Sequence, residues 1–151
     1  MNLIKQIEQL ITLQQVDNEI AALQKKLEEA PQEIAALQER LDSQKSQQAQ
    51  VDEKISMLRQ QEQKLNSEIE EDSAQIKRSK NKLMLVENSK EYHAMMREMD
   101  NLEKTNRMRE EEKLAVEEDL VTQNNLKSSI DGEVAKLEKE IQEKQQEMDQ
   151  Q

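Results

Sequence analysis

Apolar residues recur along most of the chain with the alternating three- and four-residue spacing of a coiled coil. From Ile20 to Val86 this spacing selects twenty positions without a change of phase, and fifteen of them are apolar. Such a repeat places its side chains on one stripe of a slightly underwound helix, and the stripe packs against another helix. The pattern therefore predicts one long helical arm that ends near Val86. The positions are Ile20, Leu23, Leu27, Ala30, Ile34, Leu37, Leu41, Gln44, Gln48, Val51, Ile55, Leu58, Glu62, Leu65, Ile69, Asp72, Ile76, Ser79, Leu83 and Val86.

The repeat loses its phase over residues 87–91, and a second stripe begins at Tyr92. Asn88 and Glu91 have the spacing of a helix N-cap and capping box, so a second helix can start there. Because a connection this short joins antiparallel neighbours, we expect an all-α fold. It is a long antiparallel two-helix coiled-coil hairpin with its turn at about residues 87–91. The second stripe comprises Tyr92, Met95, Met99, Leu102, Asn106, Arg109, Lys113, Val116, Leu120, Gln123, Lys127, Ile130, Val134, Leu137, Ile141, Lys144, Met148 and Gln151.

The two stripes align when Val86 is paired with Tyr92, so that the numbers of facing residues add to 178. Leu58 then faces Leu120, and Leu41 faces Leu137. Most polar positions of one stripe fall opposite an apolar position of the other. This even spread of polar positions favours pairing of the two arms within one chain.

Five polar residues of the stripes are candidates for fixing this register. Asp72 and Asn106 form the one layer that is polar on both sides, and Glu62, Arg109 and Lys113 lie close to it. A polar layer specifies register at a cost in stability. The alternative is that a two-helix seam tolerates such residues, because the long Arg and Lys stems cover it while their charges stay in water.

The N-terminal apolar stripe has no partner in this register, because Gln151 already pairs with Leu27. The second arm could continue beyond Gln151 in a longer native chain, the segment could fold back at Pro31, or two chains could form a homodimer through residues 3–27. Pro31 is expected to kink or break the first arm. The chain then divides into an N-terminal helical segment, residues 1–30, and a hairpin, residues 31–151. The unpaired residues are Leu3, Ile7, Leu10, Leu13, Val16, Ile20 and Leu23.

The composition argues against several classes of function. The chain has a net charge of −11, no cysteine, one glycine, and His93 as its one histidine. It therefore lacks the residues of a thiolate zinc site, a glycine-rich phosphate loop or a cysteine–histidine pair. We expect no catalytic, cofactor-binding or metal-ligating residue and no enzyme activity. The N-terminus enters a charged helical pattern without an apolar run, which favours a cytoplasmic location away from the membrane.

The residues around the turn, 77–104, differ in charge from the rest of the chain. They contain seven basic and five acidic residues, whereas the whole chain is at −11. Met84, Leu85 and Met96 add apolar side chains outside the two stripes, and methionine is common on adaptable binding surfaces. We expect this tip to dock onto an acidic, partly apolar protein surface; the alternative is that these residues broaden the tip's own core and add solubility. The candidate residues are Lys77, Arg78, Lys80, Lys82, Met84, Leu85, Lys90, Tyr92, Met96 and Arg97.

Three stretches of the chain carry a family resemblance. They begin at Leu10 (LITLQQVDNEI), at Ala30 (APQEIAAL) and at Val86 (VENSKEYHAM). Together they resemble a widespread bacterial family in which a long coiled-coil hairpin is followed by a four-cysteine zinc ribbon. The likeness covers essentially the whole chain, and the Asn-x-Lys-Glu-Tyr stretch at Asn88 is its most specific element.

The resemblance implies a nucleic-acid-binding protein, and for some members a link to the nitrogen-type sigma factor or to flagellar and type III secretion assembly. Zinc is then expected only in a C-terminal ribbon beyond residue 151, since these residues contain no cysteine.

Three functions follow as expectations. The first is a non-enzymatic scaffold, adaptor or chaperone-like module that binds a protein partner, such as a sigma factor or a secretion or flagellar component. The second is a nucleic-acid-binding regulator, whose binding would need the missing ribbon because the arms are acidic. The third is a purely structural dimeric rod, for which tip substitutions would have no effect on binding.

Overall fold

The computed structural model describes residues 2–150 as two helices, α1 (Asn2–Leu83) and α2 (Ser89–Gln150). Only residues 84–88 within that range are not helical. The predicted all-α antiparallel hairpin is therefore confirmed. Gln151, the last position of the predicted second stripe, lies outside the described residues.

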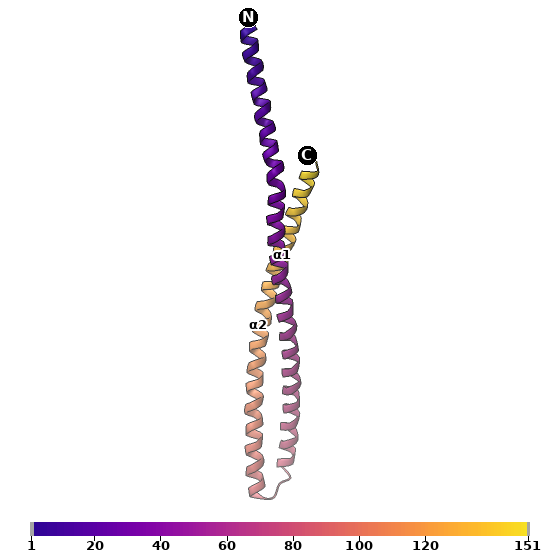
Figure 1. The fold of residues 1–151 in the computed structure, drawn as a ribbon. Coiled ribbons are helices and arrows are strands. Elements are labelled where there is room, and N and C mark those ends of the chain that lie inside the picture. The colour runs from indigo at the N-terminus through magenta and orange to yellow at the C-terminus, as the bar shows by residue number, and fades with distance from the viewer. Residues whose placement is uncertain (1, 151) are drawn as a thin grey trace. The chain divides into compact units, whose positions relative to one another are not determined.

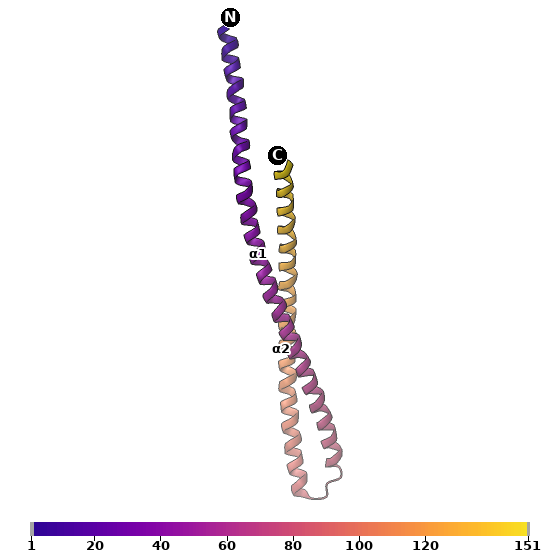
Figure 2. The ribbon, with the colours of Figure 1, turned by 45° about the vertical axis from the view of Figure 1, so that its right-hand side comes forward.

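The chain divides into two compact units, and each contains parts of both helices. The tip unit is Gln48–Ser129, and the terminal unit is formed by the described residues of Met1–Gln47 and Ile130–Gln151. In the tip unit α1 and α2 run side by side in both views (Figure 1, Figure 2). Their connection closes the end of this unit.

The core of the tip unit follows the predicted stripes. Leu58, Leu65 and Val116 are buried together, and Leu120 packs against them. Val51, Ile55 and Met99 are buried as well. Because these positions recur every three or four residues on both helices, one narrow apolar seam holds the unit together. Leu58 and Leu120 belong to one cluster, as the register of 178 predicts.

The terminal unit has a shorter seam of the same kind. Leu37 and Leu41 of α1 are buried, as are Ile130, Val134, Leu137 and Ile141 of α2. Leu137 is the most enclosed, at 2% exposed, and its predicted partner Leu41 is 5% exposed. Arg40 pairs with Glu133 at 3.9 Å and Lys45 with Glu138 at 3.5 Å along the edges of this seam.

Pro31 does not break the first arm, because it lies inside the continuous helix α1. Proline removes one backbone hydrogen bond, normally accepted by the carbonyl four residues earlier. The turns on both sides of Pro31 supply the remaining hydrogen bonds of a very long helix. The alternative in which the N-terminal segment folds back at Pro31 is therefore wrong for this structure.

The predicted turn at residues 87–91 is wrong by about three residues, because the connection occupies residues 84–88. The backbone N–H of Leu85 donates to the carbonyl of Lys82 at 3.0 Å, so α1 ends in a tight turn after Leu83. The second helix begins where Asn88 caps it: the Asn88 Oδ1 accepts a hydrogen bond from the backbone N–H of Lys90 at 2.9 Å. This bond satisfies one of the free N–H groups at the start of α2.

Candidate functional site

A charged cluster lies across the seam of the tip unit at the predicted polar layer. The guanidinium of Arg109 in α2 donates from Nη1 to the Asp72 carboxylate of α1, and its Nε lies 3.1 Å from Glu68 Oε2. Glu68 and Asp72 are one turn apart on α1, so a single arginine spans both carboxylates. Asp72 is the one charged residue of the buried set among the described residues, at 8% exposed.

The hydrogen bond to Asp72 raises the pKa of Arg109 above its ordinary value. Burial acts in the opposite direction, and the charges of Asp72, Glu68 and Glu112 add to the increase. The guanidinium is charged throughout the physiological range, as arginine is in proteins generally.

The other three residues that were predicted to fix the register, Asn106, Lys113 and Glu62, do not pair with Arg109. The Asn106 amide donates to Ser73 Oγ at 3.5 Å, while its carbonyl Oδ1 is buried with no hydrogen-bond partner among the described residues. Lys113 pairs along its own helix with Glu117 at 3.9 Å. Glu62 is half-buried, and no ion pair joins it to Arg109 or Lys113 within residues 2–150. The cluster is therefore Asp72, Glu68 and Arg109, with Asn106 beside it.

The connection at the tip presents two large apolar side chains to solvent. Met84 is 87% exposed and Leu85 is 82% exposed, the two highest values among the exposed large hydrophobic residues. The adjacent Val86 is half-buried, so the chain places one apolar residue inward and two outward. Met96, expected to join this surface, is half-buried in the first turns of α2.

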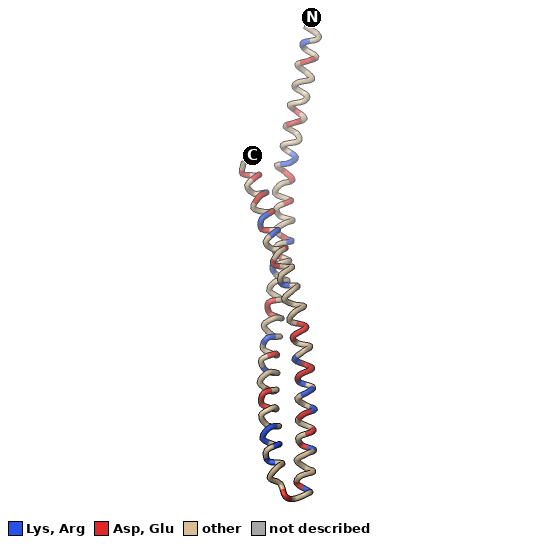
Figure 3. Tube along the Cα trace, turned by 180° about the vertical axis from the view of Figure 1, so that it is seen from behind, with Lys and Arg blue, Asp and Glu red and all other residues tan. Residues whose placement is uncertain are grey.

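Basic side chains lie on the ends of the two helices that flank these two residues. Lys77, Arg78, Lys80, Lys82, Lys90 and Arg97 are all exposed. Lys80 pairs with Glu103 at 3.8 Å, and Arg97 donates to the backbone carbonyl of His93 at 3.5 Å. Figure 3 shows the corresponding blue bands in the last turns of α1. We define the tip surface as Met84 and Leu85 with the exposed basic residues of 77–97.

Two aromatic rings lie at the base of the tip surface. Tyr92, expected to form the first layer of the seam, is 41% exposed, because α1 has already ended at Leu83. Its ring meets that of His93 edge-on, with 5.9 Å between the centroids. The predicted layer of Val86 and Tyr92 therefore lies beyond the paired helices, where Tyr92 can contribute to the tip surface.

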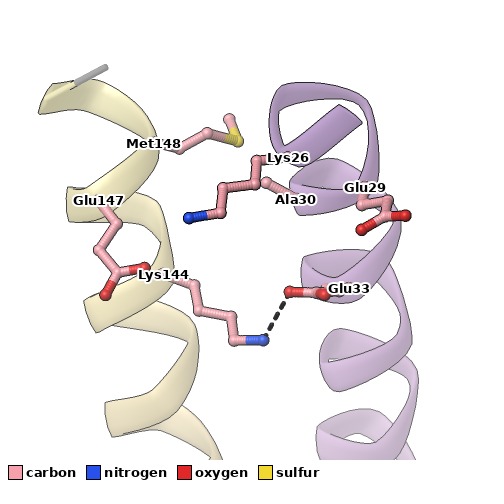
Figure 4. Close-up of a pocket in the computed structure, with 7 residues that line it drawn as sticks. All are labelled: Lys26, Glu29, Ala30, Glu33, Lys144, Glu147 and Met148. Atoms are coloured by element: carbon pink, nitrogen blue, oxygen red, sulfur yellow. Dashed lines mark hydrogen bonds and ion pairs between the residues drawn. The ribbon is translucent and has the colours of Figure 1, made fainter. Parts of the chain in front are cut away.

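A hollow lies between α1 and α2 in the terminal unit (Figure 4). Lys144 Nζ donates to Glu33 Oε2 at 2.8 Å, and this hydrogen bond raises the pKa of Lys144. Met148 and Lys26 extend into the space between the two helices. The hollow has carboxylates and ammonium groups on both sides.

The residues do not fit a metal centre. Within residues 2–150 no group of three or more His, Cys, Asp or Glu side chains is placed to hold a metal ion, and the sequence has no cysteine. A four-thiolate zinc site of the kind implied by the resemblance therefore cannot be built from these residues. No helix in the same range combines the length and apolar character needed to cross a membrane.

The fold and its surfaces define a coiled-coil hairpin with an exposed apolar and basic tip. No protein-family model, no curated protein and no solved structure matches this chain.

Proposed function

We propose that this chain is a non-enzymatic interaction module that captures a protein partner through its tip surface, as a scaffold, adaptor or chaperone-like component. The exposure of Met84 and Leu85 is the observation that carries the proposal. A narrow seam buries or half-buries the stripe residues of both helices in the tip unit apart from Tyr92, whereas Met84 and Leu85 are the most exposed large apolar residues that the structure describes. Two large apolar side chains in a five-residue connection are therefore available for a partner.

The chemistry of the tip surface indicates the partner's complementary surface. Apolar residues surrounded by lysine and arginine fit an apolar pocket with an acidic rim. Basic charge in a chain whose net charge is −11 also orients the encounter, because the arms repel the same acidic partner. The resemblance to the zinc-ribbon family supplies candidates: the nitrogen-type sigma factor and flagellar or type III secretion components in the bacterial cytoplasm.

Nucleic-acid binding is the weaker candidate for these residues. The chain is acidic overall, and the basic residues of the tip are interspersed with Glu87 and Glu91. A phosphate backbone needs several unopposed cations along one face. Binding to RNA or DNA that falls steeply with salt would support this candidate over protein capture.

The proposal is tested with matched apolar substitutions. Met84→Ser with Leu85→Ser removes the apolar part of the tip surface. Met57→Ser with Leu114→Ser makes the same chemical change at positions of the tip unit that are 64% and 61% exposed. Binding of purified nitrogen-type sigma factor is measured by biolayer interferometry, and helicity is checked by circular dichroism.

We expect the tip variant to bind at least about tenfold more weakly, since apolar anchors at the centre of an interface dominate its affinity. The control variant should bind like the unaltered chain. Equal binding by all three proteins would contradict capture through the tip. Failure of the unaltered chain to bind the sigma factor would remove that partner, and the same variants would then be compared with a flagellar export component.

A further inference from the structure

The N-terminal part of α1 exposes a continuous apolar stripe that nothing in the terminal unit covers. Eight large side chains along it are between 44% and 68% exposed. Seven steps carry the stripe from Leu3 to Leu27, so its mean spacing of about 3.4 residues stays close to the 3.5 of a coiled coil. The eight residues are Leu3, Ile7, Leu10, Leu13, Val16, Ile20, Leu23 and Leu27.

This stripe nearly maps onto itself when the chain direction is reversed about residue 15. Position 3 exchanges with 27, 7 with 23, and 10 with 20. The remaining two positions, 13 and 16, would exchange with 17 and 14, so Leu13 and Val16 are each one residue away from an exact match. A two-fold interface requires a surface that is complementary to its own copy. We propose that a second copy of this chain packs antiparallel on residues 3–27, with the two-fold axis near residue 15.

Each contact of this dimer joins two apolar residues. Leu3 packs against the partner's Leu27, Ile7 against the partner's Leu23, and Leu10 against the partner's Ile20. Leu13 meets the partner's Val16 near the axis. The two-fold axis repeats every contact, so eight apolar layers form over about 36 Å of helix. Leaving so many large apolar residues in water is unfavourable, and a second helix removes them from it.

The interface continues one that the structure already contains. Ile20, Leu23 and Leu27 have the same heptad phase as the seam residues Leu37 and Leu41, which α2 covers. Near the end of the described part of α2 (Ser89–Gln150), Met148 lines the hollow with Ala30 of α1. In the proposed register the partner's Leu3 lies at the level of Leu27, so the second copy covers the stripe residues that are exposed in this structure. It also runs in the direction of α2.

The charges of the segment are compatible with this register. No charged residue between 3 and 27 occupies a position of the stripe. Lys5 and the partner's Lys25 come to the same level. Each is two residues from the nearest stripe positions on either side, so both point away from the contact. Asp17 and Glu19 lie at the levels of the partner's Leu13 and Ile11, so they meet no like charge.

The first test measures mass as a function of concentration. Sedimentation equilibrium of the full chain between about 1 and 100 µM should show exchange between 17.7 kDa and twice that mass, because dimers dissociate by mass action. Leu10→Gln with Ile20→Gln should weaken the dimer at least about 100-fold, since each substitution acts twice across a two-fold axis. Met57→Gln with Leu114→Gln, at exposed positions outside the stripe, should leave the dimer unchanged.

The second test measures orientation. The chain has no native cysteine, so introduced cysteines react alone. A short bis-maleimide should join two chains that carry both Ile7→Cys and Leu23→Cys. It should not join chains with Ile7→Cys alone, because antiparallel packing separates those two sites by about 24 Å.

A chain that stays at 17.7 kDa over the whole concentration range would overturn the proposal. Cross-linking through Ile7→Cys alone would show parallel packing and would overturn it as well. A dimer that the glutamine pair does not weaken would place the contact elsewhere. The tip variants Met84→Ser and Leu85→Ser should dimerise normally, so this result is independent of the proposed partner capture.

Discussion

Removing one leucine from the seam of the terminal unit tests whether burial between α1 and α2 stabilises the hairpin. Leu137 is 2% exposed and lies between Val134 and Ile141, which are 8% and 7% exposed. Leucine-to-alanine changes at fully buried sites cost about 2–5 kcal/mol. A two-helix seam is open at its edges, so the cavity is partly filled by water and neighbouring stems. We therefore expect Leu137→Ala to lower the free energy of unfolding by about 2–3 kcal/mol.

The matched control is Leu114→Ala on the same helix, where the leucine is 61% exposed. Both substitutions gain the same helix propensity, so their difference isolates burial. The control should change stability by less than about 0.5 kcal/mol. A difference of about 2 kcal/mol corresponds to roughly a 30-fold change in the folding equilibrium.

Urea unfolding followed by circular dichroism at constant protein concentration measures both variants. Amide exchange near residue 137 should report the same loss locally. Equal stability of the two variants would refute the view that the seam holds the arms together.

Three further predictions concern single polar residues. Asn88→Ala should cost about 1 kcal/mol and speed amide exchange in the first turn of α2, because its side chain caps that helix, whereas Asn88→Gly should cost only a few tenths. The hydrogen bond to Glu33 raises the pKa of Lys144, so this stabilisation is complete below the ordinary value of 10.5 and is lost as the pH rises through the raised pKa. Melting temperatures measured below pH 10.5 and above the raised pKa of Lys144 should show this loss of stability. In the Lys144→Arg variant the loss should occur at higher pH, and the same pH dependence in the variant and the unaltered chain would contradict the assignment. Asn106→Leu should raise the free energy of unfolding by about 1 kcal/mol, because it removes a buried unpaired oxygen, and a fall in stability measured by urea would argue that the amide is needed there.

The seam was predictable from the sequence because burial in a coiled coil follows spacing along the chain. Every stripe position from Ala30 to Val86 and from Met95 to Met148 is buried or half-buried, including polar ones such as Gln44 and Lys144. The unpaired N-terminal stripe was predictable for the same reason. Spacing specifies which face meets the other helix, and the sum of 178 then specifies the register.

The end of the first helix was harder to predict, because the apolar stripe continues through Val86 while the helix ends at Leu83. Apolar spacing reports which residues point inward and carries no information on which backbone bonds close a turn. The cap at Asn88 was the better signal, since an N-cap residue precedes the first helical residue and therefore indicates a start at Ser89.

Only one of the two acidic partners of Arg109 was predicted from the sequence. Asp72 lies in the seam and was recognised, whereas Glu68 flanks the seam and was missed. Flanking positions of antiparallel helices pair across the seam, as Lys80 and Glu103 do. A search of flanking positions for opposite charges one turn from Asp72 would have found Glu68.

Cross-linking within one chain tests the hairpin most directly. Leu58→Cys and Leu120→Cys place two thiols in the same apolar cluster of the tip unit. A short bis-maleimide added at high dilution should join them within a single chain, and the product should run at the mass of one chain under denaturing conditions. If only products with the mass of two chains form, α1 and α2 pair between molecules and the chain does not fold back on itself.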